Sequence, residues 1–212
     1  LKKNKSQKIY YGAWKIKRFK GKIYYVDRKN KILLKSKYIN SDALWHNVGL
    51  AVKVALDFGV KKNIIAKTIS KIEFEGRVQY IRKGRLKKLL QSKESLLIDG
   101  CHSEVSAQNL ANYLKTIKKP IYGIWGMQSN RDPVNFIRCF RGIFKKIITL
   151  KIPNELNAEK AAVLKKIATR NNFYAETSKN IPEALKLLSN GQDKIVVIFG
   201  SLYLVGNALS LN

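Results

Sequence analysis

The sequence has few cysteines and no long apolar run. Cys101 and Cys139 are the only cysteines, and their wide separation fits neither a disulfide framework nor the spacing of a zinc site. No stretch approaches the roughly 18 apolar residues that a membrane-spanning helix needs. No apolar segment with a small-residue cleavage site follows Leu1. We therefore expect a soluble protein of the reducing cytoplasm, with two free thiols and no membrane partner.

Acidic residues are also scarce. The 42 lysines and arginines outnumber the 14 aspartates and glutamates, which gives a formal net charge of +28. A charge of this size favours nucleic-acid binding. However, 33 of the basic residues are lysines spread over the whole length, whereas a nucleic-acid reader usually concentrates its basic residues on one element. Drift of composition at exposed positions explains the pattern better. We expect non-specific attraction to polyanions at low salt and no specific nucleic-acid partner.

The first third of the chain has the pattern of a β-meander followed by two helices. A helical pattern opens at Asn47, and Leu50, Val54 and Phe58 share one face of it, which we expect to be the buried face. A second helix is expected over Lys61–Ile69. The predicted strands, which are β-branched and aromatic runs separated by polar turns, span Lys8–Arg18, Lys22–Val26 and Ile32–Tyr38.

From residue 96 onward, short apolar strands alternate with helices. This alternation is typical of a sheet covered on both faces, so we expect an α/β domain. The polar passage Glu73–Arg77 is the expected boundary, which gives domains of residues 1–72 and 73–212. The predicted strands span residues 96–99, 121–125, 146–150 and 195–199. The predicted helices span residues 103–118, 133–144, 157–170 and 180–190, and a last one starts at Ser201.

Polar residues follow three of these strands, where an open α/β sheet gathers its ligands. After the first strand, Asp99, His102 and Ser103 could meet a ribose and a phosphate, or Asp99 and Ser103 could simply cap the next helix. After the last strand, Gly200-Ser201 fits two interpretations equally well: an anion-binding corner, or a tight turn with a capping serine.

The third polar cluster spans Gly126–Pro133. Asp132 and Pro133 have the pattern of a helix start, which is a structural role. Arg131 is the only charged group of the cluster that can bind an anion, and the residues alone leave open whether it does.

Five short motifs occur in order along the chain. They are Asn47 with Ala51, Gly76-Arg77-Val78-Gln79, Leu96 to His102, Gly126 to Asp132, and Gly200 to Gly206. These segments resemble, respectively, the N-x-x-x-A, G-R-x-Q, L-L-x-D-x-A-H-N-P, G-M-x-x-D-K-D and G-S-x-x-x-V-G motifs of folylpolyglutamate synthases and dihydrofolate synthases, which belong to the Mur ligase superfamily. Because other Mur ligases are not expected to carry both G-R-x-Q and the closing motif, the chain is more similar to the folate branch.

This resemblance implies a Rossmann-like Mur-ligase C-terminal domain, which is a mixed sheet with helices on both faces. The β-meander and helices that precede it would be left over from the central domain. The family uses ATP and Mg²⁺ to turn a carboxylate of dihydropteroate or folate into an acyl phosphate, which the amine of L-glutamate then attacks. The C-terminal domain closes over ATP to assemble the site.

The resemblance also implies roles for single residues. Asn47 would contact adenine, Arg77 the phosphates and Asp99 the ribose. His102 would be the catalytic residue near the incoming glutamate, and Ser201 and Arg131 would bind glutamate or another anion. No metal ligand is expected in this chain.

The chain also departs from the family pattern. Ser103-Glu104 stands where the family has Asn-Pro, Asn130-Arg131 stands where it has Asp-Lys, and the family's His-Gln pair upstream of Asn47 is absent. No G-x-x-x-x-G-K-[ST] loop for the β- and γ-phosphates occurs. We therefore expect a chain that begins mid-domain at Leu1, is inactive alone and needs an N-terminal half, which is either cut away or supplied as a separate chain. The alternative is a degenerate, non-catalytic remnant that binds nucleotides or polyanions.

Overall fold

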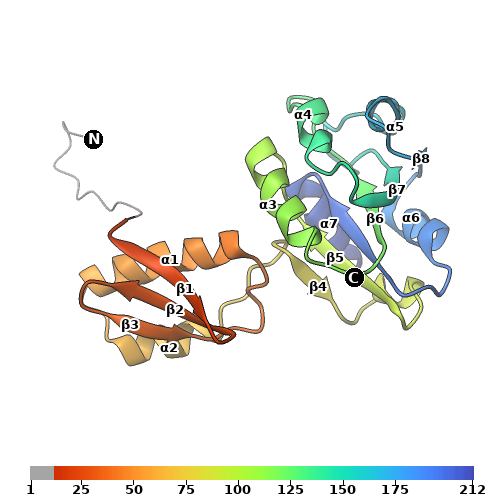
Figure 1. The fold of residues 1–212 in the computed structure, drawn as a ribbon. Helices are drawn as coiled ribbons and strands as arrows, with labels where there is room; N and C mark the ends of the chain where they lie inside the picture. Colours follow the sequence, from red (N-terminus) through yellow and green to blue (C-terminus); the bar gives the residue numbers. More distant parts are fainter. Residues whose placement is uncertain (1–11) are drawn as a thin grey trace. The chain divides into compact units, whose positions relative to one another are not determined.

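A computed structural model describes residues 12–212, which divide into two compact units (Figure 1). The first unit ends at Phe74, and the second runs from Glu75 to Asn212. Residues 8–11 of the first predicted strand lie outside the described residues. No helix within residues 12–212 combines the length and the apolar character needed to cross a bilayer.

The first unit contains the predicted antiparallel meander. Strands β1 (Trp14–Phe19), β2 (Lys22–Asp27) and β3 (Lys31–Leu34) pair in chain order. The third strand is shorter than predicted, since it ends at Leu34 rather than Tyr38. The reason is a local turn in which the Ser36 hydroxyl accepts the backbone N–H of Tyr38, 3.1 Å away.

Helix α1 (Asp42–Asp57) begins five residues before the predicted start at Asn47. Its N-cap is Ser41, whose hydroxyl accepts the N–H of Leu44 at 3.4 Å; this capping signal was overlooked in the sequence. The predicted buried face is also wrong, because the Leu50 and Phe58 side chains are 45% and 85% exposed. The face that packs on the sheet and on α2 (Lys62–Ile69) carries Leu44, Trp45, Val48, Gly49 and Val52.

The second unit is built on a mixed sheet, as predicted, and this sheet has six strands, two more than predicted (Figure 1). Its strand order is β4-β5-β9-β6-β7-β8, and only β4 runs antiparallel to its neighbour. The two edge strands were missed because each has only three residues, too few for a period to emerge. The strands are β4 (Gln79–Ile81), β5 (Glu94–Asp99), β6 (Ile121–Trp125), β7 (Phe144–Thr149), β8 (Ala175–Thr177) and β9 (Lys194–Phe199).

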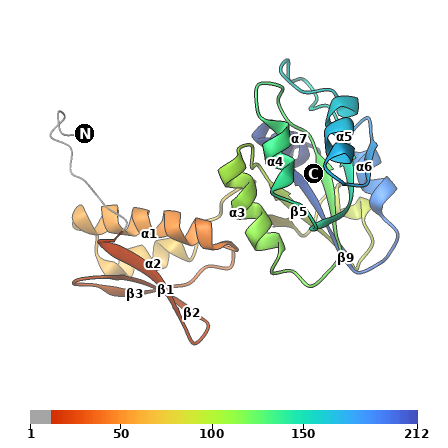
Figure 2. The ribbon, with the colours of Figure 1, turned by 45° about the horizontal axis from the view of Figure 1, so that its top comes forward.

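Helices cover both faces of this sheet, also as predicted (Figure 2). One face packs against α3 (Glu104–Leu114), α4 (Pro133–Arg138) and α5 (Ala161–Arg170). The other packs against α6 (Ile181–Leu188), α7 (Leu202–Leu211) and a 3₁₀ turn at Lys87–Leu89. Helix α4 is shorter than the predicted 133–144, since the chain turns at Gly142 (φ +75°) and β7 already begins at Phe144.

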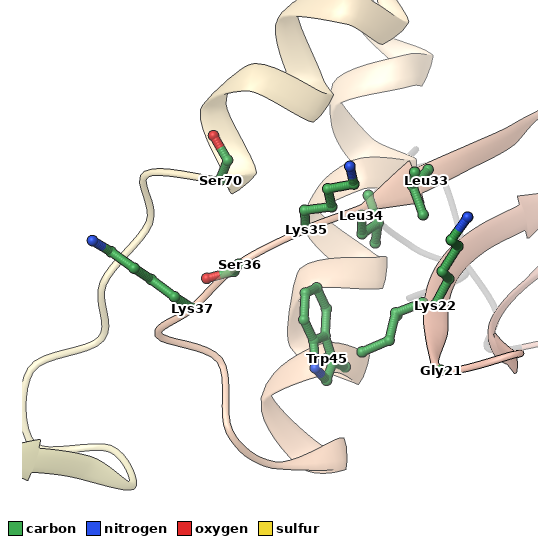
Figure 3. A pocket seen from close by; sticks show the side chains of 10 residues that line it. Gly21, Lys22, Leu33, Leu34, Lys35, Ser36, Lys37, Trp45 and Ser70 are labelled. Carbon is green, nitrogen blue, oxygen red and sulfur yellow. The ribbon is translucent and has the colours of Figure 1, made fainter.

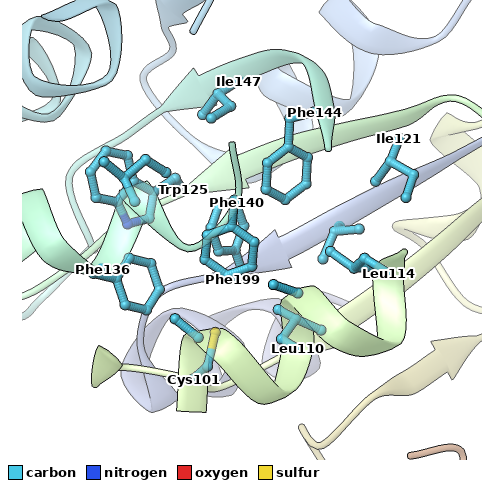
Figure 4. Packing of buried hydrophobic residues seen from close by; sticks show 14 of the residues in the cluster. Cys101, Leu110, Leu114, Ile121, Trp125, Phe136, Phe140, Phe144, Ile147 and Phe199 are labelled. Atoms are coloured by element: carbon cyan, nitrogen blue, oxygen red, sulfur yellow. The ribbon is translucent and has the colours of Figure 1, made fainter. Parts of the chain in front are cut away.

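Aromatic side chains fill the core beneath α3 and α4 (Figure 4). The Phe199 ring lies at the centre, with ring centroids 4.9 Å from Phe144, 5.0 Å from Phe140 and 6.0 Å from Phe136. Trp125 stacks on Phe199 at 6.5 Å. Such ring pairs add to the apolar area that they bury. They fix the ends of β6 and β9 side by side, which positions the turns that follow these strands.

A fully buried ion pair joins the opposite ends of β5 and β9. Glu94 and Lys194, the paired first residues of these strands, are both 0% exposed, and their carboxylate and ammonium groups are 3.2 Å apart. Burial raises the pKa of Glu94, but hydrogen bonds outweigh this effect and lower the pKa to about 2. The four hydrogen bonds to the carboxylate come from the Ser189 hydroxyl and from the backbone N–H groups of Asn190, Gln91 and Gly191.

Glu94→Gln should strongly destabilise the second unit, because it leaves the Lys194 charge buried without a counter-ion. The expected loss in free energy of unfolding is about 3 kcal/mol, measured by urea denaturation at neutral pH. For the unmodified chain, a carboxyl pKa that folding lowers from 4.5 to about 2 contributes stability above pH 4.5, and this contribution disappears as the pH falls towards 2. The variant should lack this acid-dependent loss.

The matched control for Glu94→Gln is Asp193→Asn. Asp193 pairs with Lys119 on the surface, where the two side chains are 53% and 46% exposed. Because exposed pairs contribute little, the change should stay within about 0.5 kcal/mol. If the two substitutions lowered the free energy of unfolding equally, the buried pair would contribute no more to stability than the exposed pair.

Candidate functional site

Three strand ends meet at one edge of the second unit's sheet. In the register of the sheet, Phe199 of β9 pairs with Asp99 of β5 on one side and with Trp125 of β6 on the other. The polar clusters that follow these strands therefore share one edge, as their positions in the sequence predicted. This is the carboxyl edge, where α/β sheets bind their ligands.

Gly200 lets two of these turns approach closely. Its φ is +111°, and a Cβ atom there would lie 2.5 Å from the backbone oxygen of Gly126. A residue with a Cβ atom would be strained at this φ, and its Cβ would clash with Gly126 unless the backbone moved. The glycine that opens the closing motif is thus required by the geometry between β9 and β6.

Asp99 is buried at the end of β5, with 5% of its surface exposed. Its carboxylate accepts the backbone N–H of Val78 at 2.9 Å and that of Cys101 at 2.8 Å. Burial raises the pKa of Asp99, against the opposing effect of these hydrogen bonds and of the Arg77 charge. Asp99 does not cap α3, so that interpretation of the sequence is wrong. Instead it ties together two segments that lie about twenty residues apart.

The segment that Asp99 holds is the turn of Gly76 to Gln79. The Gly76 oxygen accepts the N–H of Gly100 at 2.8 Å, and the Gln79 side chain accepts the N–H of Gly76 at 2.8 Å. Val78 adopts φ +46°, a conformation that β-branched residues rarely take. Arg77 stands between these fixed points and is partly exposed. The turn therefore presents a guanidinium group at the sheet edge.

His102 follows the same strand end and is held by the backbone. Its Nδ1 lies 2.9 Å from the Gly100 oxygen. Because a carbonyl oxygen can only accept, Nδ1 is the donor of this hydrogen bond, and Nε2 is the ring nitrogen outside it. Ser103 caps α3 in a capping box with Ser106, so the structural interpretation holds for Ser103.

Cys101 lies between Asp99 and His102 and is 1% exposed. Burial, with the neighbouring Asp99 charge, raises the pKa of its thiol well above the usual range. The thiol therefore stays protonated and acts as a small apolar side chain. Cys101 stands where the family motif has alanine, and it fills this buried position as another small side chain.

The remaining residues of the second unit's candidate site have different surroundings. Ser201 is 2% exposed, and its hydroxyl caps α7 by accepting the N–H of Tyr203 at 3.1 Å. Asp132 caps α4 before Pro133, as predicted. Arg131, next to this cap, is exposed, and its guanidinium group makes no ion pair within residues 12–212. Arg131 is thus the accessible cation of the third cluster.

Asn47 lies in the first unit, on the exposed side of α1. It lines an apolar groove of about 310 Å³ between α1 and α2. Val48, Ile65 and Ile69 contribute to the walls, and Phe74 lies at the end of the same groove. A carboxamide beside an apolar slot is suited to a flat heteroaromatic ring.

No group of three or more histidine, cysteine, aspartate or glutamate side chains in residues 12–212 is arranged to hold a metal ion.

The second unit is therefore an α/β domain, in which helices cover a mixed sheet and polar turns lie together at the carboxyl edge of that sheet. Residues 80–211 match the family model described as "Dihydrofolate synthetase, C-terminal domain". This match covers more than half of the chain, and the chain belongs to that family. A comparison with curated proteins gave no match.

Solved structures share this fold. E. coli FolC in complex with DHPP and ADP is 14% identical, with a TM-score of 0.73, and the match covers 93% of this chain and 45% of that one. Mycobacterium tuberculosis folylpolyglutamate synthase complexed with ADP and AMPPCP is 16% identical, with a TM-score of 0.75 and coverage of 95% and 48%. A bifunctional folylpolyglutamate synthase/dihydrofolate synthase with Mn, AMPPNP and L-glutamate bound is 15% identical, with a TM-score of 0.72 and coverage of 93% and 45%. The chain thus spans a little under half the length of these proteins.

Asp99→Asn should release the Arg77 turn. An asparagine amide keeps one acceptor oxygen, so one of the two backbone N–H groups would face an NH₂ group and lose its partner. We expect a loss of roughly 2 kcal/mol in free energy of unfolding. Amide hydrogen exchange should show reduced protection at Val78 or Cys101, and unchanged protection at both would contradict the role given to Asp99.

Asp132→Asn is the control for this substitution. Asp132 also accepts two backbone N–H groups, but at the exposed start of α4, where asparagine caps as well as aspartate. The unfolding midpoint of this variant should be nearly unchanged.

Proposed function

We propose that this chain is the C-terminal part of an ATP-dependent ligase that adds L-glutamate to folate or dihydropteroate. The observation that carries the proposal is the turn of Gly76 to Gln79, which Asp99 holds at the carboxyl edge of the sheet with Arg77 at its centre. A buried carboxylate and an unusual Val78 conformation maintain this turn, which is more than a simple linker would need. The family match supports the proposal, and so do the nucleotide, metal, glutamate and DHPP ligands of the structures with the same fold.

In this proposal the first unit binds the adenine base. The apolar groove between α1 and α2 takes the ring, and the Asn47 carboxamide pairs with its polar edge, as asparagine does with adenine elsewhere. The residue is exposed, so the amide is accessible. Phe74, at the end of the groove, adds an aromatic surface.

The second unit would bind the ribose and the charged groups. Arg77 neutralises phosphate oxygens with a guanidinium group whose backbone is already fixed, which limits the entropy lost on binding. Each oxygen of Asp99 accepts one backbone N–H and keeps further acceptor capacity for a ribose hydroxyl. Bound ATP would supply the phosphoryl group that activates the acceptor carboxylate.

His102, Arg131 and Ser201 would serve the incoming glutamate. Nε2 of His102 is the free acceptor that can take a proton from the amine, and exposed Arg131 can hold a carboxylate. Ser201 contributes by ordering the start of α7, because its own hydroxyl is buried. These residues orient the amine, and proximity of this kind is a large part of catalysis in ligation reactions.

The proposal requires parts that this sequence does not contain. The 212 residues hold no G-x-x-x-x-G-K-[ST] loop, so the β- and γ-phosphates would need a loop from elsewhere in the protein or from a separate chain. The Mg²⁺ ligands would come from there too. The two free thiols, Cys101 and Cys139, fit a reducing compartment, and we propose a cytoplasmic location.

The alternative is a non-catalytic remnant that keeps only nucleotide or polyanion binding. Ser103-Glu104 and Asn130 in place of the family residues favour it. The capping box of Ser103 weighs against it, because the start of α3 is still completed by a different set of hydrogen bonds. Glutamate ligation with ATP, after a chain that carries the phosphate-binding loop is added, distinguishes the two: turnover supports the ligase, and nucleotide binding without turnover supports the remnant.

Arg77→Met should weaken ADP binding to the full chain about tenfold to a hundredfold. A charge-assisted hydrogen bond contributes about 1.5–3 kcal/mol, and the variant removes it while keeping an unbranched, apolar side chain at this position. Isothermal titration at physiological salt measures the affinity. Circular dichroism should show an unchanged fold.

Arg82→Met removes the same charge from an exposed position just after β4 and is the control. Its ADP affinity should change less than twofold. If both variants lose affinity equally, or if the unmodified chain binds ADP only at low salt, the Arg77 site is ruled out.

A further inference from the structure

Two adjoining hollows follow the edge strand β3 in the first unit. One, of about 520 Å³, is lined by residues from β2, β3, the loop after β3, Trp45 and Ser70 (Figure 3). The other, of about 460 Å³, continues between β3 and α2. Leu33, Lys35 and Ser70 line both hollows, so the two form one continuous groove. We call it the β3 groove.

The β3 groove combines apolar side chains, among them Leu33 and Trp45, with cations and neutral polar groups. Figure 3 shows Lys22 and Lys35 on either side of Leu33 and Leu34. None of the lysines of the groove forms an ion pair within the described part of the chain, and no carboxylate lines either hollow. These lysines are Lys22, Lys31, Lys35, Lys37 and Lys62, and the polar groups beside them belong to Ser36, Asn63 and Ser70.

Three of the four acidic residues of the first unit have partners away from this groove, and the fourth, Glu73, lines neither hollow. Asp42 pairs with Arg18, and Asp57 pairs with Lys53. Asp27 accepts hydrogen bonds from Tyr25 and from the turn that follows it. The groove lysines are thus left without an acidic side chain in either hollow.

The start of α2 adds an unfavourable charge to the groove. Lys61 and Lys62 stand at the positive end of the helix dipole, and no acidic residue lies in the first turn. This placement costs stability in the free protein. A bound anion would reverse the sign of that effect.

Aromatic rings lie beside the groove on the open face of the meander. Tyr24 is the cross-strand neighbour of Leu33, and the Lys31 ammonium lies 4.9 Å from its ring centroid. Phe19 pairs with Lys22 and is 60% exposed. Side chains of paired residues point to the same face of a sheet. Both rings therefore lie next to residues that line the groove.

We propose that the β3 groove and the adjoining rings of Phe19 and Tyr24 bind a single-stranded polynucleotide without sequence preference. The groove lysines follow the phosphate backbone, and the rings stack on unpaired bases, which is how single strands are bound by other proteins. The groove lysines would contact phosphates, and Asn63 is the one carboxamide in the lining, so we expect little dependence on sequence. This function is independent of the proposed ligase.

The test uses the full chain and a fluorescent oligo-dT, with affinity measured by anisotropy over a range of salt concentrations. Lys22→Gln with Lys35→Gln should reduce the slope of log K against log salt by about 1.4, since each lost phosphate contact on a single strand contributes about 0.7. The control, Lys118→Gln with Lys166→Gln, removes the same charge from exposed positions of the second unit and should leave the slope unchanged. Equal slopes for the two double variants would overturn the proposal in favour of diffuse attraction.

Phe19→Ala tests the aromatic part. It should weaken oligo-dT binding about tenfold, because stacking contributes strongly per base, and leave heparin binding unchanged, because heparin has no bases. A blunt duplex of equal length should bind more weakly than oligo-dT. Equal losses for oligo-dT and heparin, or tighter binding to phosphatidylserine vesicles than to oligo-dT, would overturn the choice of ligand. ADP titration of the same variants should be unaffected, so this test and that of the ligase can fail separately.

Discussion

The organisation of the candidate site depends on one carboxylate. Asp99 receives a backbone N–H from each of two segments, one before β4 and one after β5, and it does so at 5% exposure. In such surroundings an unpaired N–H is costly, so the carboxylate specifies the path of both segments at once. Asp99 thereby positions both the segment that carries Arg77 and the segment that carries His102. Asp99, which the family resemblance assigns to the ribose, thus has a structural role that does not depend on a ligand.

The two ends of the sheet are stabilised by different means. At the start of β5 and β9, Glu94 and Lys194 form a closed, fully buried network whose hydrogen bonds leave no group for a ligand. At the other end, the carboxylate of Asp99 still has acceptor capacity, and Arg77, His102 and Arg131 reach the surface. Aromatic packing around Phe199 lies between these ends and keeps the strands in register. Under the proposed function, stability and ligand binding would depend on opposite edges of the same sheet.

Much of this arrangement could be predicted from the sequence, since apolar strands alternating with helices specify a covered sheet and polar residues mark the strand ends. The caps of α3, α4 and α7 also followed from local rules, because Ser103, Asp132 and Ser201 act on N–H groups only two or three residues away. Some failures were local, since the cap at Ser41 was overlooked and the edge strands were too short, but two others depended on distant contacts. The buried face of α1 is set by packing against Trp14 and the meander, and no periodicity within the helix distinguishes it from the face of Leu50 and Phe58. The pairing of Asp99 with Val78 joins residues far apart in the chain, so the G-R-x-Q motif marked the segment without revealing why it turns.

The division between the two units falls just before this turn, between Phe74 and Glu75. From Gly76 onward the backbone is fastened to the sheet, by Gly100 on one side of Arg77 and by Asp99 on the other. The arginine therefore belongs mechanically to the second unit, although only a few residues separate it from the first. The residues that follow α2 and precede Gly76 form no helix or strand. The backbones of Arg77 and His102 are attached to the same strand end, so the spacing between these two residues is set within the second unit.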